Sequence, residues 1–179
     1  MRKSIGVMAV MLALHLSGCA ATSSSPALVR VPDKLAVGAN ETLRMVVPAK
    51  GVQIYECRAR KEQPGAYEWA FVAPEADLFD SRGNRIGRHY GGPHWEANDG
   101  SRILGALKER ADAPGTSATP WLLLTAKSVG PHGAFSRITS IQRVNTAGGI
   151  APAAGCSAEN AGINARIAYT TDYYFFGAL

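Results

Sequence analysis

From about Val29 onward, the sequence consists of short apolar runs that glycine, proline, asparagine and aspartate interrupt at near-regular intervals. Little of this region carries the sustained 3.6-residue period of an amphipathic helix. Alternation with a period of two is clearest at residues 67–71, where Tyr, Trp and Phe alternate with Glu and Ala. The chain is therefore predicted to fold mainly from β-strands.

About eight to ten short strands are expected from this pattern. The runs that carry it are residues 44–49, 52–59, 67–71, 78–79, 85–90, 94–97, 101–107, 120–126, 135–144 and 165–176. Pro74 is expected to end its strand or to hold it at a sheet edge. Turn residues at 80–84 and 98–100 predict two hairpins. The predicted fold is all-β, a single antiparallel β-sandwich or barrel-like domain with long loops.

The N-terminus carries a separate signal. Met1-Arg2-Lys3 precedes a short apolar run, and the run ends at Leu16-Ser17-Gly18-Cys19. Such a run is too short to span a bilayer, and its basic start is typical of a secretory signal peptide. The four residues that end at Cys19 resemble the lipobox of bacterial lipoproteins. The resemblance implies a signal peptide at 1–18, with Cys19 acylated and held at a membrane.

This reading divides the chain into the signal peptide, a lipidated cysteine with a flexible tether at 19–30, and a β domain at 31–179. Ala20 and Ala21 carry no aspartate retention signal, so lipoprotein sorting implies the periplasmic face of the outer membrane in a Gram-negative cell. The alternative is an ordinary secretory signal that is cut near Ala20. Either reading predicts an exported protein.

The cysteine count supports export. The chain has three cysteines, and once Cys19 is assigned to the anchor, Cys57 and Cys156 remain. An even pair in an exported chain favours a disulfide, which would close a loop of roughly 100 residues. A reactive or metal-binding thiol pair is the alternative, but no Cys-x-x-Cys spacing supports it.

Charge argues against nucleic acid as a partner. The formal net charge is +5, and removal of Arg2 and Lys3 with the signal peptide lowers it to +3. The basic residues are scattered among acids, and aromatic residues do not interleave with them as a nucleic-acid platform requires.

Several sequence blocks, in order along nearly the whole mature chain, resemble the DUF3455 family of exported bacterial and fungal proteins. The blocks are residues 51–57, 69–78, 89–96, 99–101, 120–123, 141–149, 155–156 and 169–175. The resemblance implies no chemistry, because the function of the family is unknown. The family usually has a small residue where this chain has His94, so a site that depends on His94 would not be common to the family.

One segment is a candidate metal site for zinc or copper. His89 and His94 flank a Gly-Gly-Pro turn that would let the two imidazoles converge, and Glu96 and Asp99 follow closely. His132, in another glycine-rich loop, is a candidate distant ligand. The alternative reading is that His89 is hydrogen-bonded within the domain and His94 is exposed beside a turn.

The sequence offers candidates for two further kinds of site. Trp69, Trp95 and Tyr173 are a candidate aromatic surface for stacking sugars, although aromatics at alternating strand positions usually belong to a core. The acids Glu75, Asp77, Glu96 and Asp99 offer carboxylate pairs for glycoside hydrolysis, but the sequence does not give their separation.

The sequence favours a non-enzymatic envelope lipoprotein that binds or scaffolds a glycan, a small ligand or another envelope protein. In this reading no cofactor is expected. The alternative is a metal-dependent enzyme or redox protein with its site around His89. The sequence does not specify an oligomeric state.

Overall fold

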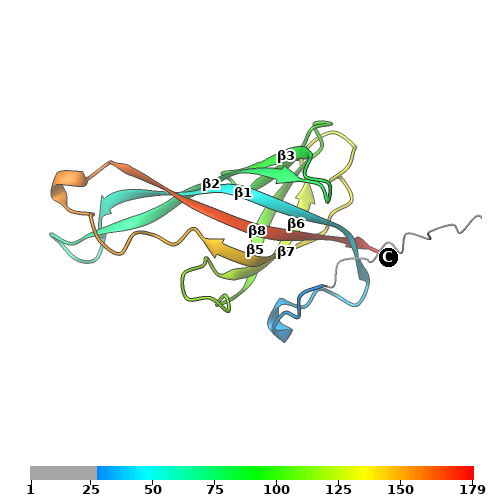
Figure 1. Ribbon diagram of the computed structural model, residues 1–179, viewed down its shortest axis with the longest axis horizontal. Helices are drawn as coiled ribbons and strands as arrows, with labels where there is room; N and C mark the ends of the chain where they lie inside the picture. The colour runs from blue at the N-terminus through cyan, green and yellow to red at the C-terminus, as the bar shows by residue number, and fades with distance from the viewer. Residues whose placement is uncertain (1–27) are drawn as a thin grey trace, which may run out of the picture.

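The computed structural model describes residues 28–179, which form a closed antiparallel ring of eight strands (Figure 1). The strands are β1 (Glu41–Ala59), β2 (Tyr67–Phe79), β3 (Arg85–Tyr90), β4 (His94–Ala97), β5 (Arg102–Ala111), β6 (Trp121–Ser128), β7 (Ser140–Gly148) and β8 (Asn164–Ala178). Two short 3-10 turns, η1 (Asp33–Leu35) and η2 (Ala158–Asn160), are the helical elements of the described chain.

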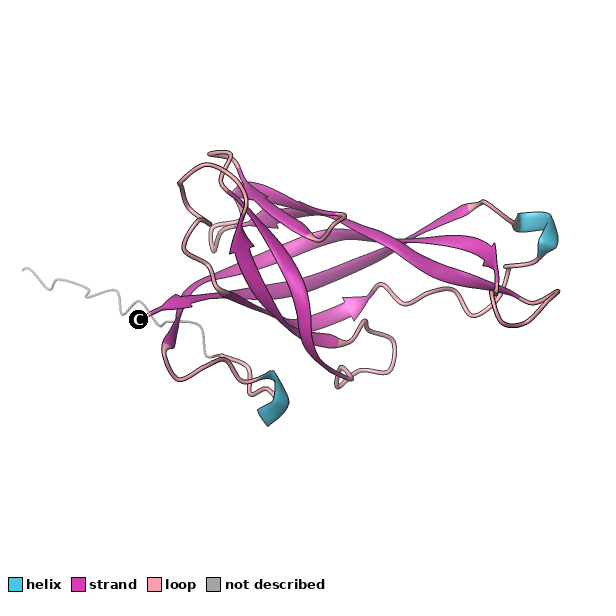
Figure 2. Cartoon of the chain, turned by 180° about the vertical axis from the view of Figure 1, so that it is seen from behind, coloured by secondary structure: helices cyan, strands magenta, loops and turns pink. Residues whose placement is uncertain are grey.

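Each strand pairs with the next strand in the sequence, and β8 closes the ring by pairing with β1. Figure 2 shows the strands crossing around a common interior. The prediction of an all-β domain is confirmed, and the closed ring makes it barrel-like rather than a sandwich. Closure matters for function because it creates an interior that all eight strands share.

The predicted strands at 44–49 and 52–59 form one strand, β1, which continues through Gly51. A β-carbon on Gly51 would lie 2.1 Å from the carbonyl oxygen of Glu75. Glycine thus allows a very close approach of β2 at this point, instead of interrupting the strand as it usually does in sequence patterns.

Pro74 does not end its strand, since β2 continues to Phe79. It pairs with Gln53 of β1, whereas pairing of β2 with β3 begins only at Glu75. At Pro74 the strand therefore has one hydrogen-bonded neighbour, and the missing N–H can face the unpaired side. Pro74 therefore lies where one side of β2 is unpaired, as the predicted edge position requires.

The run at 135–144 is only partly a strand, because β7 begins at Ser140. The backbone N–H groups of Ala134 and Phe135 donate instead to the side chains of Asp99 and Ser101. These bonds hold the residues before Ser140 as a loop, while the Phe135 side chain still enters the core.

β1, β2 and β8 extend beyond the ring as an arm, on the left of Figure 1. A disulfide joins Cys57 on β1 to Cys156 in the segment before β8, with the Cα atoms 5.3 Å apart. The predicted disulfide is confirmed. Since stable disulfides are typical of exported proteins, the bond indicates a location outside the cytoplasm.

Two apolar clusters stabilise the ring. The inner cluster fills its interior and consists of Val47, Ala49, Ala76, Leu78, Trp95, Ala97, Ile103, Leu124, Phe135, Ile138, Ile141, Tyr169, Tyr173 and Phe175. The outer cluster lies where the segment before β1 covers the outside of the ring. There Leu35 packs with Trp121, Val144 and Tyr174, and the amide of Gln142 donates to the Leu35 carbonyl at 2.7 Å.

The predicted signal peptide, Cys19 and most of the predicted tether lie outside the described residues. Between residues 28 and 179, no helix is both long enough and apolar enough to cross a membrane.

Candidate functional site

A cavity of about 380 Å³ opens at the ring, and every strand contributes at least one residue to its wall. Its lining consists of Gln53, Phe71, Val72, Pro74, His89, Gly92, Pro93, Trp95, Gly105, Ala106, Leu107, Leu122, Leu124, Arg143 and Tyr173. The volume is in the range of small-molecule sites. We call it the ring cavity.

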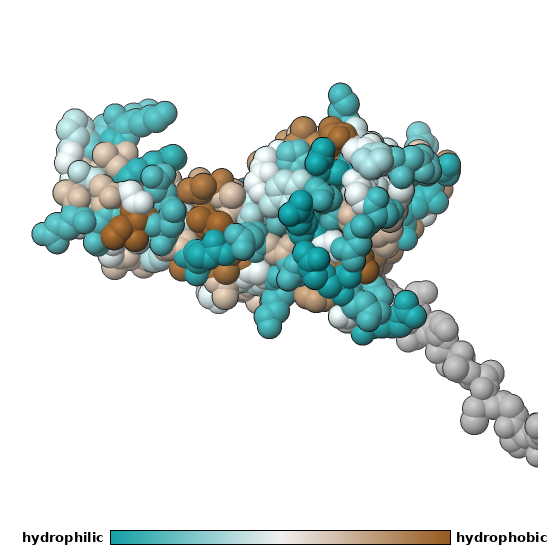
Figure 3. Space-filling view, turned by 90° about the horizontal axis from the view of Figure 1, so that it is seen from above, coloured by the Kyte–Doolittle hydropathy of each residue, from teal (hydrophilic) through white to brown (hydrophobic). Residues whose placement is uncertain are grey.

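Most of the wall of the ring cavity is apolar, and part of that apolar surface faces solvent. Phe71 and Leu107 are 52% and 62% exposed, although both are large hydrophobic residues. Apolar side chains also gather on the surface where the arm meets the ring (Figure 3). Exposed apolar side chains beside a cavity are typical of an entrance for a ligand with apolar surface.

Aromatic rings pack together on the inner wall. The imidazole of His89 stacks on the indole of Trp95 with ring centroids 4.1 Å apart. The ring of Tyr173 meets both edge-on, at 5.2 Å from His89 and 5.3 Å from Trp95. All three residues are at most 3% exposed, so this wall is held rigidly before any ligand arrives.

His89 is held as a neutral imidazole. Burial lowers its pKa to about 3, and the positive charge of Arg143 acts in the same direction. Nδ1 lies 2.8 Å from the carbonyl oxygen of His94, which can only accept a hydrogen bond. The proton is therefore on Nδ1, and Nε2 is an acceptor.

Several buried polar groups belong to residues of the lining. Gln53 is 2% exposed, and its Nε2 has no hydrogen-bond partner among the described residues. The same is true of Nε1 of Trp95. The hydroxyl of Tyr173 lies 3.4 Å from that of Tyr169, and burial raises the pKa of Tyr173 well above its ordinary value, so the phenol stays neutral. The lining thus contains buried hydrogen-bond donors that have no acceptor among the described residues.

Arg143 is the charged residue of the lining. Its Nε and Nη2 both donate to the carbonyl oxygen of Pro120, at 3.2 and 2.8 Å. Among residues 28–179, Arg143 and Arg102 are half-buried whereas the other lysines and arginines are exposed. Arg102 pairs with Glu96, but no described carboxylate lies within 4.0 Å of Arg143.

The structure does not bring His89 and His94 together as metal ligands. His89 pairs with Trp95 and stacks on it inside the ring, whereas Tyr90 pairs with His94 and stacks on it outside. Successive residues of a strand point to opposite faces, so the two imidazoles lie on opposite sides of the β3–β4 hairpin. No group of three or more potential metal-ligating side chains occurs within the described part of the chain.

The other predicted metal ligands, Glu96, Asp99 and His132, lie on the outer surface of the ring or in loops. Glu96 accepts from the hydroxyl of Tyr90 at 2.7 Å and pairs with Arg88 at 2.9 Å. Asp99 accepts from the hydroxyl of Ser101 at 2.6 Å and from the backbone N–H of Ala134 at 2.7 Å. These bonds lower the pKa values of both carboxyls. His132 is exposed in the loop that Asp99 fastens.

The predicted aromatic surface of Trp69, Trp95 and Tyr173 is not one surface. Trp95 and Tyr173 are buried in the ring cavity wall. Trp69 lies on the arm, opposite Cys57 in the strand register, and its indole N–H donates to the carbonyl of Ala154 at 2.9 Å. Two of the three predicted residues therefore meet, but in the interior.

The remaining candidate carboxylates are exposed. Glu75 pairs with Arg166 at 2.8 Å, and Asp77 forms an ion pair with Arg85. Both carboxylates are more than half exposed, so neither lies in the buried surroundings that a general acid needs.

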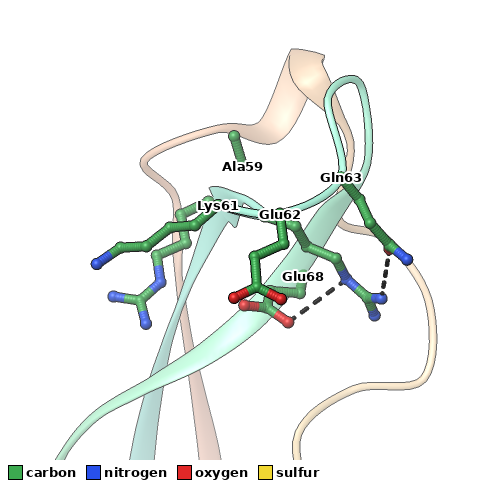
Figure 4. Close-up of a pocket in the computed structure, with 7 residues that line it drawn as sticks. Ala59, Lys61, Glu62, Gln63 and Glu68 are labelled. Carbon is green, nitrogen blue, oxygen red and sulfur yellow. Dashed lines mark hydrogen bonds and ion pairs between the residues drawn. The ribbon is translucent and has the colours of Figure 1, made fainter.

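A second hollow lies at the end of the arm, around the loop between β1 and β2 (Figure 4). The dashed lines in Figure 4 mark the contacts that the Arg60 side chain makes with Glu68 at 3.4 Å and with Gln63 at 3.0 Å. Most of the charged side chains around this hollow are exposed, Glu68 is half-buried, and the lining lacks large apolar residues. It has the character of a solvated turn.

Sequence reasoning missed Gln53 and Arg143 as site residues. Their positions in the strands could have indicated them, because residues two apart in a strand share a face. Gln53 shares a face with Tyr55 and Cys57, and Arg143 shares a face with Ile141. A polar residue at an inward position of a closed sheet is a candidate for function, but the sequence did not show which face was inward.

Comparisons with known proteins agree with the sequence pattern. No curated protein and no solved structure matches the chain significantly. The model of the family described as "Protein of unknown function (DUF3455)" matches residues 38–177, which include all of the ring except the last residue of β8. The chain belongs to the DUF3455 family.

Proposed function

We propose that this protein is a non-enzymatic binding protein of the cell envelope that holds a small, largely apolar ligand in the ring cavity. The observation that carries this proposal is the cavity itself, whose wall is mostly apolar and takes at least one residue from every strand, with Phe71 and Leu107 exposed at 52% and 62%. A small concave, mostly apolar site with few polar groups is typical of ligand binding.

The surroundings of the cavity support binding rather than catalysis. His89, the best candidate for a reactive group, is buried, stacked on Trp95 and neutral. Its Nδ1 proton is engaged by the backbone of His94. A rigid, neutral wall of this kind is suited to shape recognition.

A cavity-filling substitution tests the proposal. Leu122 lines the cavity and is half-buried, so Leu122→Trp places a larger side chain in the space a ligand would occupy. Leu104→Trp is the matched control, because Leu104 is also half-buried but pairs with His94 on the outer face of the ring. The probe is Nile red, an uncharged dye whose fluorescence rises in apolar surroundings.

We expect saturable binding of one Nile red per chain. Leu122→Trp should weaken it roughly tenfold or more, which corresponds to about 1.4 kcal/mol, and Leu104→Trp should not. The assay uses the full chain with Cys19→Ser, so that no detergent competes for the cavity. Absence of saturable binding, or equal binding by both folded variants, contradicts the proposal.

We also propose that Cys19 is the lipidated N-terminus after removal of residues 1–18. The support is the sequence Leu16-Ser17-Gly18-Cys19 behind a short apolar run, together with a disulfide typical of export. Cys19→Ser should abolish the acyl mass increment and release the protein from the membrane fraction. An unchanged membrane fraction and mass would contradict the anchor and leave the cavity proposal standing.

A further inference from the structure

We propose that the ligand of the ring cavity is an amphiphile with a single carboxylate, and that Arg143 receives this carboxylate while the apolar wall holds the rest. The proposal rests on the proposed function, and it adds the chemical class of the ligand. It is built on the charge of the lining, the position of Arg143 and the unpaired buried donors of the same lining.

The lining is electrostatically one-sided. It contains one cation, Arg143, and neither aspartate nor glutamate. His89 adds no charge because it is neutral, so the wall carries a net charge of about +1 in a poorly solvated place. A half-buried cation without a carboxylate partner is unusual, and a bound anion would compensate it.

The guanidinium of Arg143 has donor capacity left for a ligand. Its Nε and Nη2 donate to the carbonyl of Pro120, which orients the group. The side chain also faces the hydroxyl of Tyr173, and its Nη1 has no hydrogen-bond acceptor of its own among the described residues. The Pro120 contact fixes the position of the charge without neutralising it. A hydrogen bond from guanidinium to carboxylate is stronger than one between neutral groups.

Two other residues of the lining carry donors that lack an acceptor. Nε2 of Gln53 and Nε1 of Trp95 are buried donors without partners, and both residues line the same cavity as Arg143. An ionised carboxylate is an acceptor only, with room for several donors. A ligand that carried a cation or only donors would leave all these groups unsatisfied.

The single cation also sets the ligand's charge. One arginine compensates one negative charge, so a monoanionic carboxylate is favoured over a dianionic phosphate monoester. The apolar remainder of the wall, including Leu122 and Leu124, requires an apolar body. We therefore expect medium-chain carboxylic acids to be good model ligands.

The test is a head-group series of one chain length: dodecanoate, dodecanol, dodecylammonium and dodecyl phosphate, each displacing Nile red from the Cys19→Ser chain at pH 8. Dodecanoate should bind at least about tenfold more tightly than dodecanol, and dodecylammonium and dodecyl phosphate more weakly than dodecanoate. Arg143→Gln should reduce dodecanoate to about the affinity of dodecanol, while dodecanol and Nile red change little.

The outcomes separate the two proposals. If Nile red and dodecanol bind but dodecanoate gains nothing, or if Arg143→Gln weakens acid and alcohol equally, the carboxylate inference is wrong and the apolar site stands. If neither Nile red nor any amphiphile binds, the proposed function fails and the inference with it. If Arg143→Gln does not fold, the head-group series on the chain with native Arg143 still tests whether the cavity prefers a carboxylate. Tighter binding of dodecyl phosphate than of dodecanoate would overturn the choice of carboxylate.

Discussion

Gly105 of β5 lies directly against the indole of Trp95 on β4: a β-carbon at position 105 would be 2.6 Å from Cζ3 of Trp95. Trp95 has little room to withdraw, because its indole also stacks on His89 at 4.1 Å and meets the ring of Tyr173 at 5.3 Å. The absence of a side chain at Gly105 thus sets the position of the aromatic wall of the ring cavity.

Gly105→Ala should therefore destabilise the protein through overpacking, by about 1–3 kcal/mol, and should shift the indole into the cavity. Gly115→Ala is the control, since nothing lies within 4 Å of a β-carbon there and the backbone is not in the left-handed region. Urea unfolding followed by tryptophan fluorescence measures both. Equal midpoints for the two variants would show that Trp95 can move at little cost.

Removing the disulfide should lower stability substantially. Cys57 and Cys156 are separated by 99 residues, and the bond closes the arm across that loop. The chain-entropy model allows about 4.7 kcal/mol for a loop of this size, and we expect a loss of about 2–5 kcal/mol in Cys57→Ala/Cys156→Ala. Dithiothreitol should lower the unfolding midpoint of the parent protein and leave the double variant unchanged. If dithiothreitol lowered the midpoint of the double variant as much as that of the parent, the effect of the reductant would not come from the disulfide.

The stability of the protein should fall as the pH is lowered through 6.5, because of His89. Burial lowers the pKa of His89 to about 3 from an ordinary value of 6.5, so between these values the unfolded chain binds a proton that the folded chain excludes. The free energy of unfolding should be about 2 kcal/mol lower at pH 5 than at pH 8.

His89→Asn isolates this contribution, because an asparagine amide does not titrate in this range and its N–H can still donate to the His94 carbonyl. The variant should be less stable at pH 8, owing to lost packing on Trp95, but it should lack about 2 kcal/mol of the decrease toward pH 5. Urea titrations at the two pH values measure the difference. Parallel pH profiles for parent and variant would rule out a buried neutral imidazole.

Ser101 should be the critical polar residue under the loop before β7. It is fully buried, and its hydroxyl donates to Asp99 and accepts from the backbone N–H of Phe135 at 3.0 Å. Ser101→Ala leaves that N–H without its partner, so we expect a loss of about 1–3 kcal/mol. Ser128→Ala, at an exposed position, should be near neutral. Comparable losses from both substitutions would argue that the loop is held by other contacts.

Much of the fold followed from local patterns. In the run at 165–176, Tyr169 and Tyr173 are four residues apart and so share a strand face, and the structure has both in the inner cluster. The even pair Cys57 and Cys156 predicted the disulfide that is present. Strand ends were harder to predict, because Gly51 and Pro74 resemble breaks in sequence but are accommodated by a close approach of β2 and by an unpaired strand side.

The candidate site was less predictable. His89 and His94 looked like partners because they are five residues apart across a turn. The register of the hairpin pairs His89 with Trp95, which puts the two histidines on opposite faces. A change of register by one residue reverses the faces, and hairpin register depends on turn geometry that the motif did not specify.

The sequence by itself determined the strand content, the alternation of faces, the cysteine pair and the membership of the family, since these depend on local period and composition. Only the tertiary structure decided which face became the interior, because the ring must close before β1 meets β8. Closure brings Gln53, Trp95 and Arg143, from three separate strands, to one cavity. An alternating pattern specifies two faces equally well, and long-range pairing chooses between them.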